Sequence, residues 1–140
     1  MLLSKSGKYA IQAMIYLAEK KSNKPILIVE ISKAYHIPHQ YLRKIMQPLV
    51  KQRLVVGTRG PKGGMKLAKD SKEILLNQIV YAIDGLPSDT DQCVVGLDNC
   101  NDDIPCPFHD RWDPIRKQIQ EMLASASLYD LAERVVEKRN

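Results

Sequence analysis

Residues 39–68, HQYLRKIMQPLVKQRLVVGTRGPKGGMKLA, contain the pattern that decides the fold. Apolar residues recur at helical spacing from Tyr41 to Val50, shortly after a proline that is tolerated in the first turn of a helix. The period then changes from 3.6 to 2, which is typical of strands. The stretch therefore predicts a helix followed by a strand, a glycine-rich turn and a second strand: LVVGTR at 54–59, GPKGG at 60–64 and MKLA at 65–68.

Two more helices are expected before this stretch. Residues 4–21 form an amphipathic pattern that begins at Ser4, a residue that can cap a helix. A shorter apolar pattern begins near Ile28 and stops near His36. Two short helices joined by such a turn form a helix-turn-helix unit, and three helices followed by a hairpin describe a winged helix. The predicted fold is therefore mainly α, with a small β-hairpin wing.

The 140-residue chain has a net charge of +5 that is unevenly distributed. Residues 1–70 hold 14 basic and 3 acidic residues, a net charge of +11, whereas residues 71–140 hold 7 basic and 13 acidic residues, a net charge of −6. A strongly positive N-terminal half suits a polyanionic partner such as double-stranded DNA. Surface lysines that only keep the protein in solution are the alternative interpretation.

Polar side chains on the exposed face of the third helix are predicted to bind DNA. Such side chains can pair with base edges in the major groove, and a lysine at the helix end can reach phosphates. Basic residues at the tip of the wing can reach the adjacent minor groove or the backbone. A solvated helix face is the alternative. The predicted DNA-binding residues are His39, Gln40, Arg43, Lys44, Gln47 and Lys51 on the helix and Arg59 and Lys62 on the wing.

Residues 73–140 are predicted to form a sensor and dimerisation region after a DNA-binding region at 1–72. A helix is expected at 74–84, a long helix after Asp110 as its N-cap, and a last helix after Ser127. One face of the long helix is apolar and lacks an obvious partner in the nearby sequence. We therefore expect it to pack against the same helix of a second subunit. The residues predicted at this dimer interface are Trp112, Ile115, Ile119 and Met122.

The cysteine segment, defined here as residues 93–109, holds all three cysteines of the chain and one histidine. Three thiolates and an imidazole so close in sequence can hold one small inorganic centre. Zinc would accept this donor set as a closed tetrahedral site, and a [2Fe–2S] cluster would accept it as two ligands per iron. Reduced cysteines without a metal are the third alternative. The predicted metal ligands are Cys93, Cys100, Cys106 and His109.

Three stretches together resemble the Rrf2 family of bacterial transcription regulators: SKSGKYAIQAM at 4–14, residues 41–68, and the cysteine segment before a long helix. The resemblance implies a cytoplasmic homodimeric winged-helix regulator of the IscR and NsrR type, which binds a palindromic DNA operator. It also implies that the three cysteines ligate an iron–sulfur cluster, of the [2Fe–2S] type or alternatively [4Fe–4S]. His109 matches the histidine ligand of the IscR type. Such a regulator would sense iron, redox, nitric oxide or cluster status.

The sequence alone is consistent with three kinds of protein. They are a cluster-sensing transcription regulator, a winged-helix regulator with structural zinc or no metal, and a small metalloprotein that does not bind DNA. The histidines and carboxylates form no nucleophile–base pairing at readable spacing, which argues against an enzyme. No apolar run approaches the roughly 18 residues of a membrane-spanning helix, so neither membrane insertion nor secretion is expected.

Overall fold

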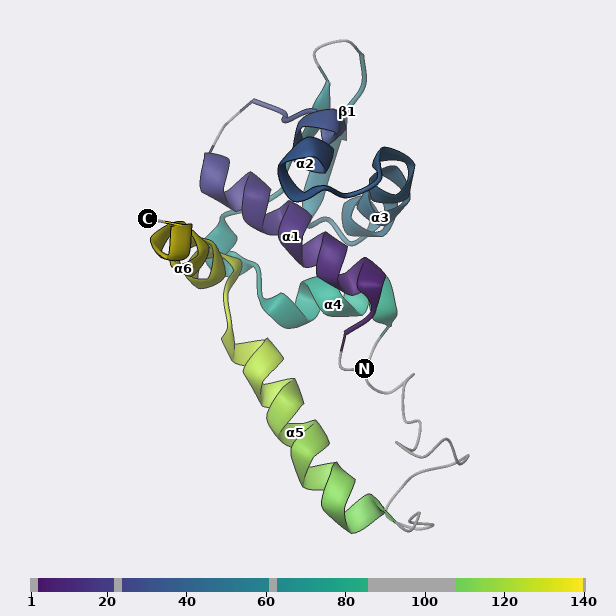
Figure 1. Cartoon of the computed structure of the whole chain (residues 1–140), viewed down its shortest axis with the longest axis vertical. Helices are drawn as coiled ribbons and strands as arrows, with labels where there is room; N and C mark the ends of the chain where they lie inside the picture. Colours follow the sequence, from purple (N-terminus) through teal and green to yellow (C-terminus); the bar gives the residue numbers. More distant parts are fainter. Residues whose placement is uncertain (1–2, 22–23, 61–62, 86–107, 140) are drawn as a thin grey trace.

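The computed structural model describes residues 3–21, 24–60, 63–85 and 108–139. In this part of the chain helices dominate and the one sheet is a two-stranded hairpin, which confirms the predicted fold class. Figure 1 shows α2, α3, α4 and α6 around α1, with the hairpin at one end of the molecule and α5 at the other. In chain order the elements are α1 (Lys5–Lys20), α2 (Ile28–Tyr35), α3 (His39–Lys51), β1 (Val55–Thr58), β2 (Gly64–Leu67), the 3₁₀ helix η1 (Ser71–Glu73), α4 (Leu76–Asp84), α5 (His109–Ser125) and α6 (Leu128–Arg139).

Helix α1 is the central element of the core. Ser4 caps it, as predicted, because the Ser4 Oγ accepts a hydrogen bond of 2.9 Å from the Gly7 amide. Ala10, Ala13 and Met14 on its apolar stripe are completely buried. Helix α1 contacts α2, α3, β2, α4 and α6, so it joins the basic and the acidic halves of the chain in one core.

Helices α2 and α3 form the predicted helix-turn-helix unit. His36 ends α2 in the left-handed backbone conformation, with φ of 54°, and Pro38 is the N-cap of α3 rather than part of its first turn. Between them Ile37 is buried, and its amide donates a hydrogen bond of 3.0 Å to the Ser32 carbonyl oxygen. These contacts fix the turn between the two helices. The residues that α3 buries in the core are Leu42, Ile45, Met46 and Leu49.

Strands β1 and β2 pair antiparallel, with Val55 opposite Leu67, which confirms the predicted wing. The backbones of Ile26 and Met65 exchange two hydrogen bonds of 2.7 Å, so the segment before α2 pairs with the wing. This pairing requires glycine at position 64. The φ of Gly64 is +153°, and a Cβ there would lie 2.3 Å from the Ile26 carbonyl oxygen.

The acidic half of the chain packs onto the same core. The Leu76 amide donates to the Ala126 carbonyl oxygen and the Leu128 amide donates to the Ile74 carbonyl oxygen, both at 2.8 Å. The segments before α4 and before α6 therefore lie side by side, and both helices contact α1. The helix predicted at 74–84 begins two residues later than expected, because Ile74 is extended and takes part in this pairing.

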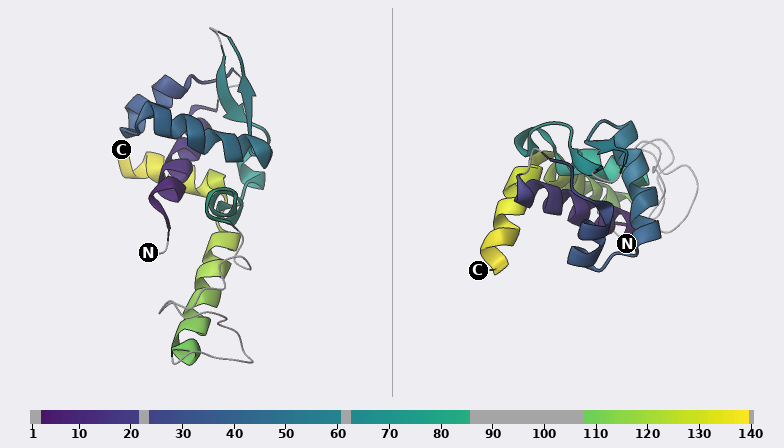
Figure 2. Two further views of the ribbon diagram at one scale, coloured as in Figure 1. Left: turned by 90° about the vertical axis from the view of Figure 1, so that its right-hand side faces the viewer. Right: turned by 90° about the horizontal axis from the view of Figure 1, so that it is seen from above.

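Helix α5 projects from the rest of the molecule as an arm, as Figure 1 and the left view of Figure 2 show. The predicted capping of α5 by Asp110 is wrong. The helix begins at His109 with Phe108 as its N-cap, because the chain already has helical geometry at Asp110. Within the described ranges, no helix is both long enough and apolar enough to span a lipid bilayer.

We expect Gly64→Ala to lower the free energy of unfolding by about 2–4 kcal/mol, because its methyl group would collide with the Ile26 backbone. Gly60→Ala is the matched control: its φ is +102°, but no described atom lies within 4 Å of the added Cβ. Its cost should be only the backbone strain of about 1–2 kcal/mol. Urea unfolding followed by circular dichroism measures both variants, and equal losses would contradict the proposed clash.

Candidate nucleic-acid interface

A groove of about 820 Å³ lies between α2, α3 and the wing. Its lining comes from the start of α2, one face of α3 and the facing ends of β1 and β2. Arg43, Lys51 and Arg59 make the groove basic, and none of its described lining residues is acidic. A concave surface of this charge attracts the phosphate backbone of a nucleic acid.

Helical geometry decides which of the predicted DNA-binding residues meet in this groove. His39, Arg43 and Gln47 are four residues apart and share one face of α3. Gln40 and Lys44 are exposed, but they are rotated from that face by about 100° and do not line the groove. Lys62 lies outside the described residues. The predicted residues that the structure brings together are His39, Arg43, Gln47 and Lys51 from α3 and Arg59 from the wing.

The groove also has an apolar component that sequence reasoning missed. Leu27 and Val29 at the start of α2 are 46% and 42% exposed, and Val50 on α3 is 38% exposed. Val50 belongs to the apolar pattern read from Tyr41 to Val50, but it lies outside the core, because its neighbour Leu49 occupies the inward position. The sequence already held a signal for this outcome. Leu49 and Val50 are adjacent, and adjacent residues on a helix do not share a narrow face, so both could not point into the core. Apolar side chains in such a place can contact thymine methyl groups.

Two contacts with α1 position α3. The hydroxyl groups of Ser6 and Tyr41 form a hydrogen bond. The rings of Tyr9 and Tyr41 meet edge to face with their centroids 5.5 Å apart. Tyr41 begins the apolar pattern of α3, but it is 38% exposed because its ring packs along α1 instead of entering the core. The orientation of α3 therefore depends directly on α1.

The end of α4 is bound to the start of α1. The Asp84 carboxylate accepts hydrogen bonds from the Ser4 hydroxyl group and, at 3.5 Å, from the Ser4 amide. A carboxylate is favourable here because the helix dipole gives the start of α1 partial positive charge. A Cβ at Gly7 would lie only 2.9 Å from the Asp84 Oδ2, so glycine permits this approach. Helices α4, α1 and α3 are thus connected by polar contacts.

The predicted dimer-interface residues share one face of α5. Ile115 and Met122 are 49% and 51% exposed, and Trp112 and Ile119 are half-buried. Helix α4 is the main neighbour of α5 within the described part of the chain. The arm therefore carries a partly exposed apolar face.

The opposite face of α5 is polar. The Asp113 carboxylate forms ion pairs with Arg116 and with Lys117, whose Nζ lies 2.9 Å from the Asp113 Oδ2. The hydrogen bond from Lys117 holds the pKa of the Asp113 carboxyl below its ordinary value. The Asp113 and Arg116 side chains are only 14% and 26% exposed, so their charges are paired away from water, whereas Ile115 and Met122 on the apolar face are about half exposed.

The predicted metal site is only partly within the described residues. Cys93, Cys100 and Cys106 lie outside them, so the ligand set stays a prediction. His109 is described: it is the first residue of α5, is 7% exposed, and is the one buried polar side chain in the described ranges. Those ranges contain no group of three or more His, Cys, Asp or Glu side chains that could hold a metal ion.

Residues 3–134 match the model of the Rrf2 family, which is described as "Iron-dependent Transcriptional regulator". The chain belongs to the Rrf2 family. Among curated relatives of this Rrf2 protein, the HTH-type transcriptional regulator IscR of Photorhabdus laumondii is 33% identical over 131 residues, which cover 94% of this chain and 79% of the relative. The IscR protein of Sodalis glossinidius is 32% identical and covers 94% and 78% of the two chains.

Solved structures show the same fold. The Bacillus subtilis global cysteine regulator CymR superposes with a TM-score of 0.79 at 27% identity, covering 94% of this Rrf2 chain and 96% of CymR. The structure of T. potens IscR gives a TM-score of 0.77 at 25% identity, with 99% and 90% covered. These relatives are transcription regulators and not enzymes, so the predicted class of a DNA-binding transcription regulator is confirmed.

Arg43→Ala and Arg59→Ala should change DNA binding in different ways. If Arg43 contacts a base, its loss costs about 1–3 kcal/mol and relaxes the sequence preference. If Arg59 contacts the backbone or the minor groove, its loss weakens all sequences alike and lowers the slope of log affinity against log salt by about 1. Fluorescence anisotropy over a salt series, on an operator selected from random duplexes, measures both effects.

Lys33→Ala is the matched control for these two variants. Lys33 is exposed on α2 and does not line the groove, so its loss should leave the sequence preference unchanged. If both arginine variants retain wild-type affinity, the DNA-binding face has been assigned to the wrong surface.

Proposed function

We propose that this Rrf2 protein is a homodimeric regulator whose affinity for a palindromic operator depends on an iron–sulfur cluster held by the cysteine segment. The basic groove between α2, α3 and the wing is the observation that carries the DNA-binding part. Membership of a family described as iron-dependent, and likeness to proteins named IscR, support the cluster-dependent part.

The chemistry of the donor set fits an iron–sulfur cluster. Thiolates of Cys93, Cys100 and Cys106 would be the sulfur ligands, because soft donors prefer such a centre. The imidazole of His109 would complete two ligands per iron in a [2Fe–2S] cluster. It is 7% exposed and is the first residue of α5. When bound, the cluster would supply sensitivity to redox state and to iron supply.

Dimerisation through α5 would give the regulator its two-fold symmetry. The arm projects from the core and carries Ile115 and Met122 about half exposed on one face. In a symmetric dimer the same face of both arms is covered, which removes this apolar surface from water. Two recognition helices related in this way would read two half-sites about one helical turn of DNA apart, on a palindromic operator.

The contacts around α1 offer a route from the cysteine segment to the recognition helix. Asp84 ends α4, on the N-terminal side of the cysteine segment, and binds Ser4 at the start of α1. Ser6 on the same end of α1 binds Tyr41 of α3. A change in the position of α4 would therefore move α1 and α3 with it. DNA affinity and cluster retention are then linked, and each must shift the other in the same sense.

Ile119→Glu should convert the dimer into a monomer, because a charge in an apolar seam costs several kcal/mol when it is unpaired. Ala124→Glu is the matched control, since Ala124 is exposed on the polar side of α5. Sedimentation velocity at micromolar concentration measures the assembly of both variants. A dimeric Ile119→Glu protein would show that the subunit interface lies elsewhere.

Single alanine variants of the three cysteines should lose the cluster, and their operator affinity should move to the value of the wild-type protein without the cluster. His109→Ala should retain a more labile cluster, because thiolates bind iron more firmly than neutral imidazole. Anaerobic purification with absorption spectroscopy and with iron, sulfide and zinc analysis measures cluster content, and anisotropy measures affinity. Loss of the cluster without any change in affinity would contradict sensing. Stoichiometric zinc without iron would instead support a structural metal.

A further inference from the structure

The exposed side of α3 carries polar side chains that do not line the DNA-binding groove. Arg43 faces the groove and Tyr41 faces α1, and the two residues are about 200° apart around the helix. Gln40 and Lys44 are exposed between these two directions, away from the residues that α3 buries. The groove and α1 therefore flank α3 on opposite sides, with a polar ridge between them.

The start of α1 contacts the side of α3 that faces away from the groove (Figure 1). We call this contact the α1–α3 junction and define it by Ser6, Tyr9 and Tyr41. The hydroxyl groups of Ser6 and Tyr41 share a hydrogen bond, which uses only one of their two hydrogens. The Tyr9 ring meets the Tyr41 ring edge to face, and Tyr41 is 38% exposed. The junction thus offers a hydroxyl donor at the surface of the protein.

Two lysines lie beside the α1–α3 junction. Lys5 is exposed, and its Nζ lies 5.8 Å from the centroid of the Tyr9 ring. Lys44 is exposed on α3 and follows Tyr41 by three residues, so the two side chains are neighbours on the helix surface. Both ammonium groups can therefore reach a polyanion that lies along the junction.

The Asp84 carboxylate lies on a different side of α1 from the junction. It contacts Ser4 and lies close to Gly7. Tyr9 follows Gly7 by two residues and is therefore about 200° from it around the helix. The negative charge at the end of α4 is thus directed away from the junction.

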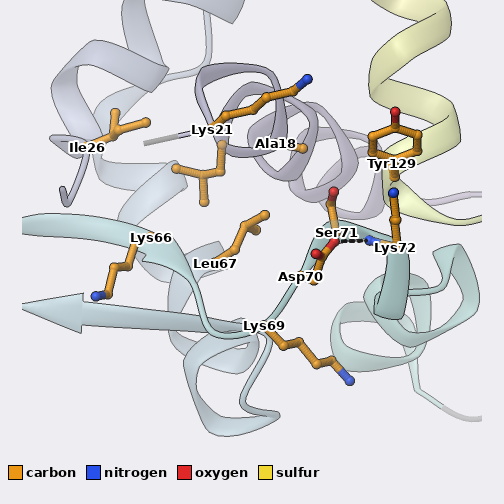
Figure 3. Close-up of a pocket in the computed structure, with 11 residues that line it drawn as sticks. Ala18, Lys21, Ile26, Lys66, Leu67, Lys69, Asp70, Ser71, Lys72 and Tyr129 are labelled. Carbon is orange, nitrogen blue, oxygen red and sulfur yellow. Dashed lines mark hydrogen bonds between the residues drawn. The ribbon is translucent and has the colours of Figure 1, made fainter. Parts of the chain in front are cut away.

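Lysines at the other end of α1 have different surroundings, and Figure 3 shows them. The Lys21 Nζ lies 3.4 Å from the Glu133 carboxylate of α6, and the Lys72 Nζ lies 4.8 Å from the centroid of the Tyr129 ring. These contacts join the end of α1 and η1 to α6. The lysine at the start of α1, by contrast, lies beside α3.

DNA geometry gives the two sides of α3 equivalent partners. The major groove is about 12 Å wide and a helix with its side chains is about 10–12 Å across, so a helix in this groove has a sugar–phosphate backbone on each side. Lys51 and Arg59 line the groove beside the wing, which can receive one backbone. The α1–α3 junction lies where the second backbone would run.

We propose that the α1–α3 junction binds the backbone of the second DNA strand, with Lys5 and Lys44 as its phosphate contacts. The hydroxyl groups of the junction would add a hydrogen bond to a phosphate oxygen. This inference rests on the proposed DNA-binding function and extends the interface from α3 and the wing to α1.

The double variant Lys5→Gln/Lys44→Gln should weaken binding to all duplexes alike, because phosphate contacts carry no sequence information. We expect the slope of log affinity against log salt to fall by about 2, while the sequence preference stays that of the wild type. Fluorescence anisotropy over a salt series on the selected operator measures the slope. The matched control, Lys33→Gln/Lys138→Gln, removes the same charge from exposed positions outside the junction and should leave the slope unchanged.

Operators with single neutral methylphosphonate links test which strand each surface binds. Such a link weakens binding where a charged side chain contacts the phosphate that it replaces. We expect Lys5→Gln/Lys44→Gln to lose this sensitivity in one strand of each half-site, and Arg59→Ala to lose it in the other strand. Thermal melting confirms that the variants are folded.

The outcomes separate this inference from the proposed function. An unchanged salt slope in Lys5→Gln/Lys44→Gln, with normal operator binding by the wild type, would overturn the inference alone. A changed sequence preference in that variant, or loss of sensitivity in the same strand as Arg59→Ala, would overturn it as well. A wild-type protein without salt-dependent binding to any duplex would overturn the proposed function itself.

Discussion

The close packing of α1 against its neighbours is the constraint on which the rest of the structure depends. Ala10 and Ala13 are completely buried, and α1 is in contact with elements from both halves of the chain. Small side chains at these two positions let the neighbouring helices approach α1 closely. A larger residue at either position would separate them, at a cost of about 1–3 kcal/mol. The DNA-binding elements and the helices that flank α5 therefore share one core, and neither group can move freely without the other.

The two ends of α1 contact different elements. At its N-terminal end, Ser4 and Ser6 bind Asp84 of α4 and Tyr41 of α3, so this end joins the acidic half to the recognition helix. At its C-terminal end, Lys21 pairs with Glu133 of α6. A single helix thus contacts both α3, which carries the residues proposed to bind DNA, and α4, the helix that precedes the cysteine segment.

The candidate DNA-binding site was only partly predictable from sequence, and the division has a physical reason. His39, Arg43 and Gln47 could be found because one helix places residues four apart on one face. Leu27 and Val29 could not be found in this way, because they reach the groove from another helix. Their place depends on the angle between α2 and α3, which the turn around His36 and Ile37 determines and which no local period reveals.

The sequence by itself determined the helical periods, the hairpin, the capping of α1 by Ser4 and the division of charge, because each depends on residues close together in the chain. The sequence also showed that the cysteine segment holds three thiolates and an imidazole that could ligate a metal centre. Only the tertiary structure decided that α4 and α6 pack on α1, through backbone pairing between residues 74–76 and 126–128. Only it showed that Phe108, not Asp110, precedes α5, and that α5 leaves the core as an arm. The packing of α4 and α6 on α1 depends on contacts between residues far apart in the chain, and a local sequence pattern does not encode its geometry.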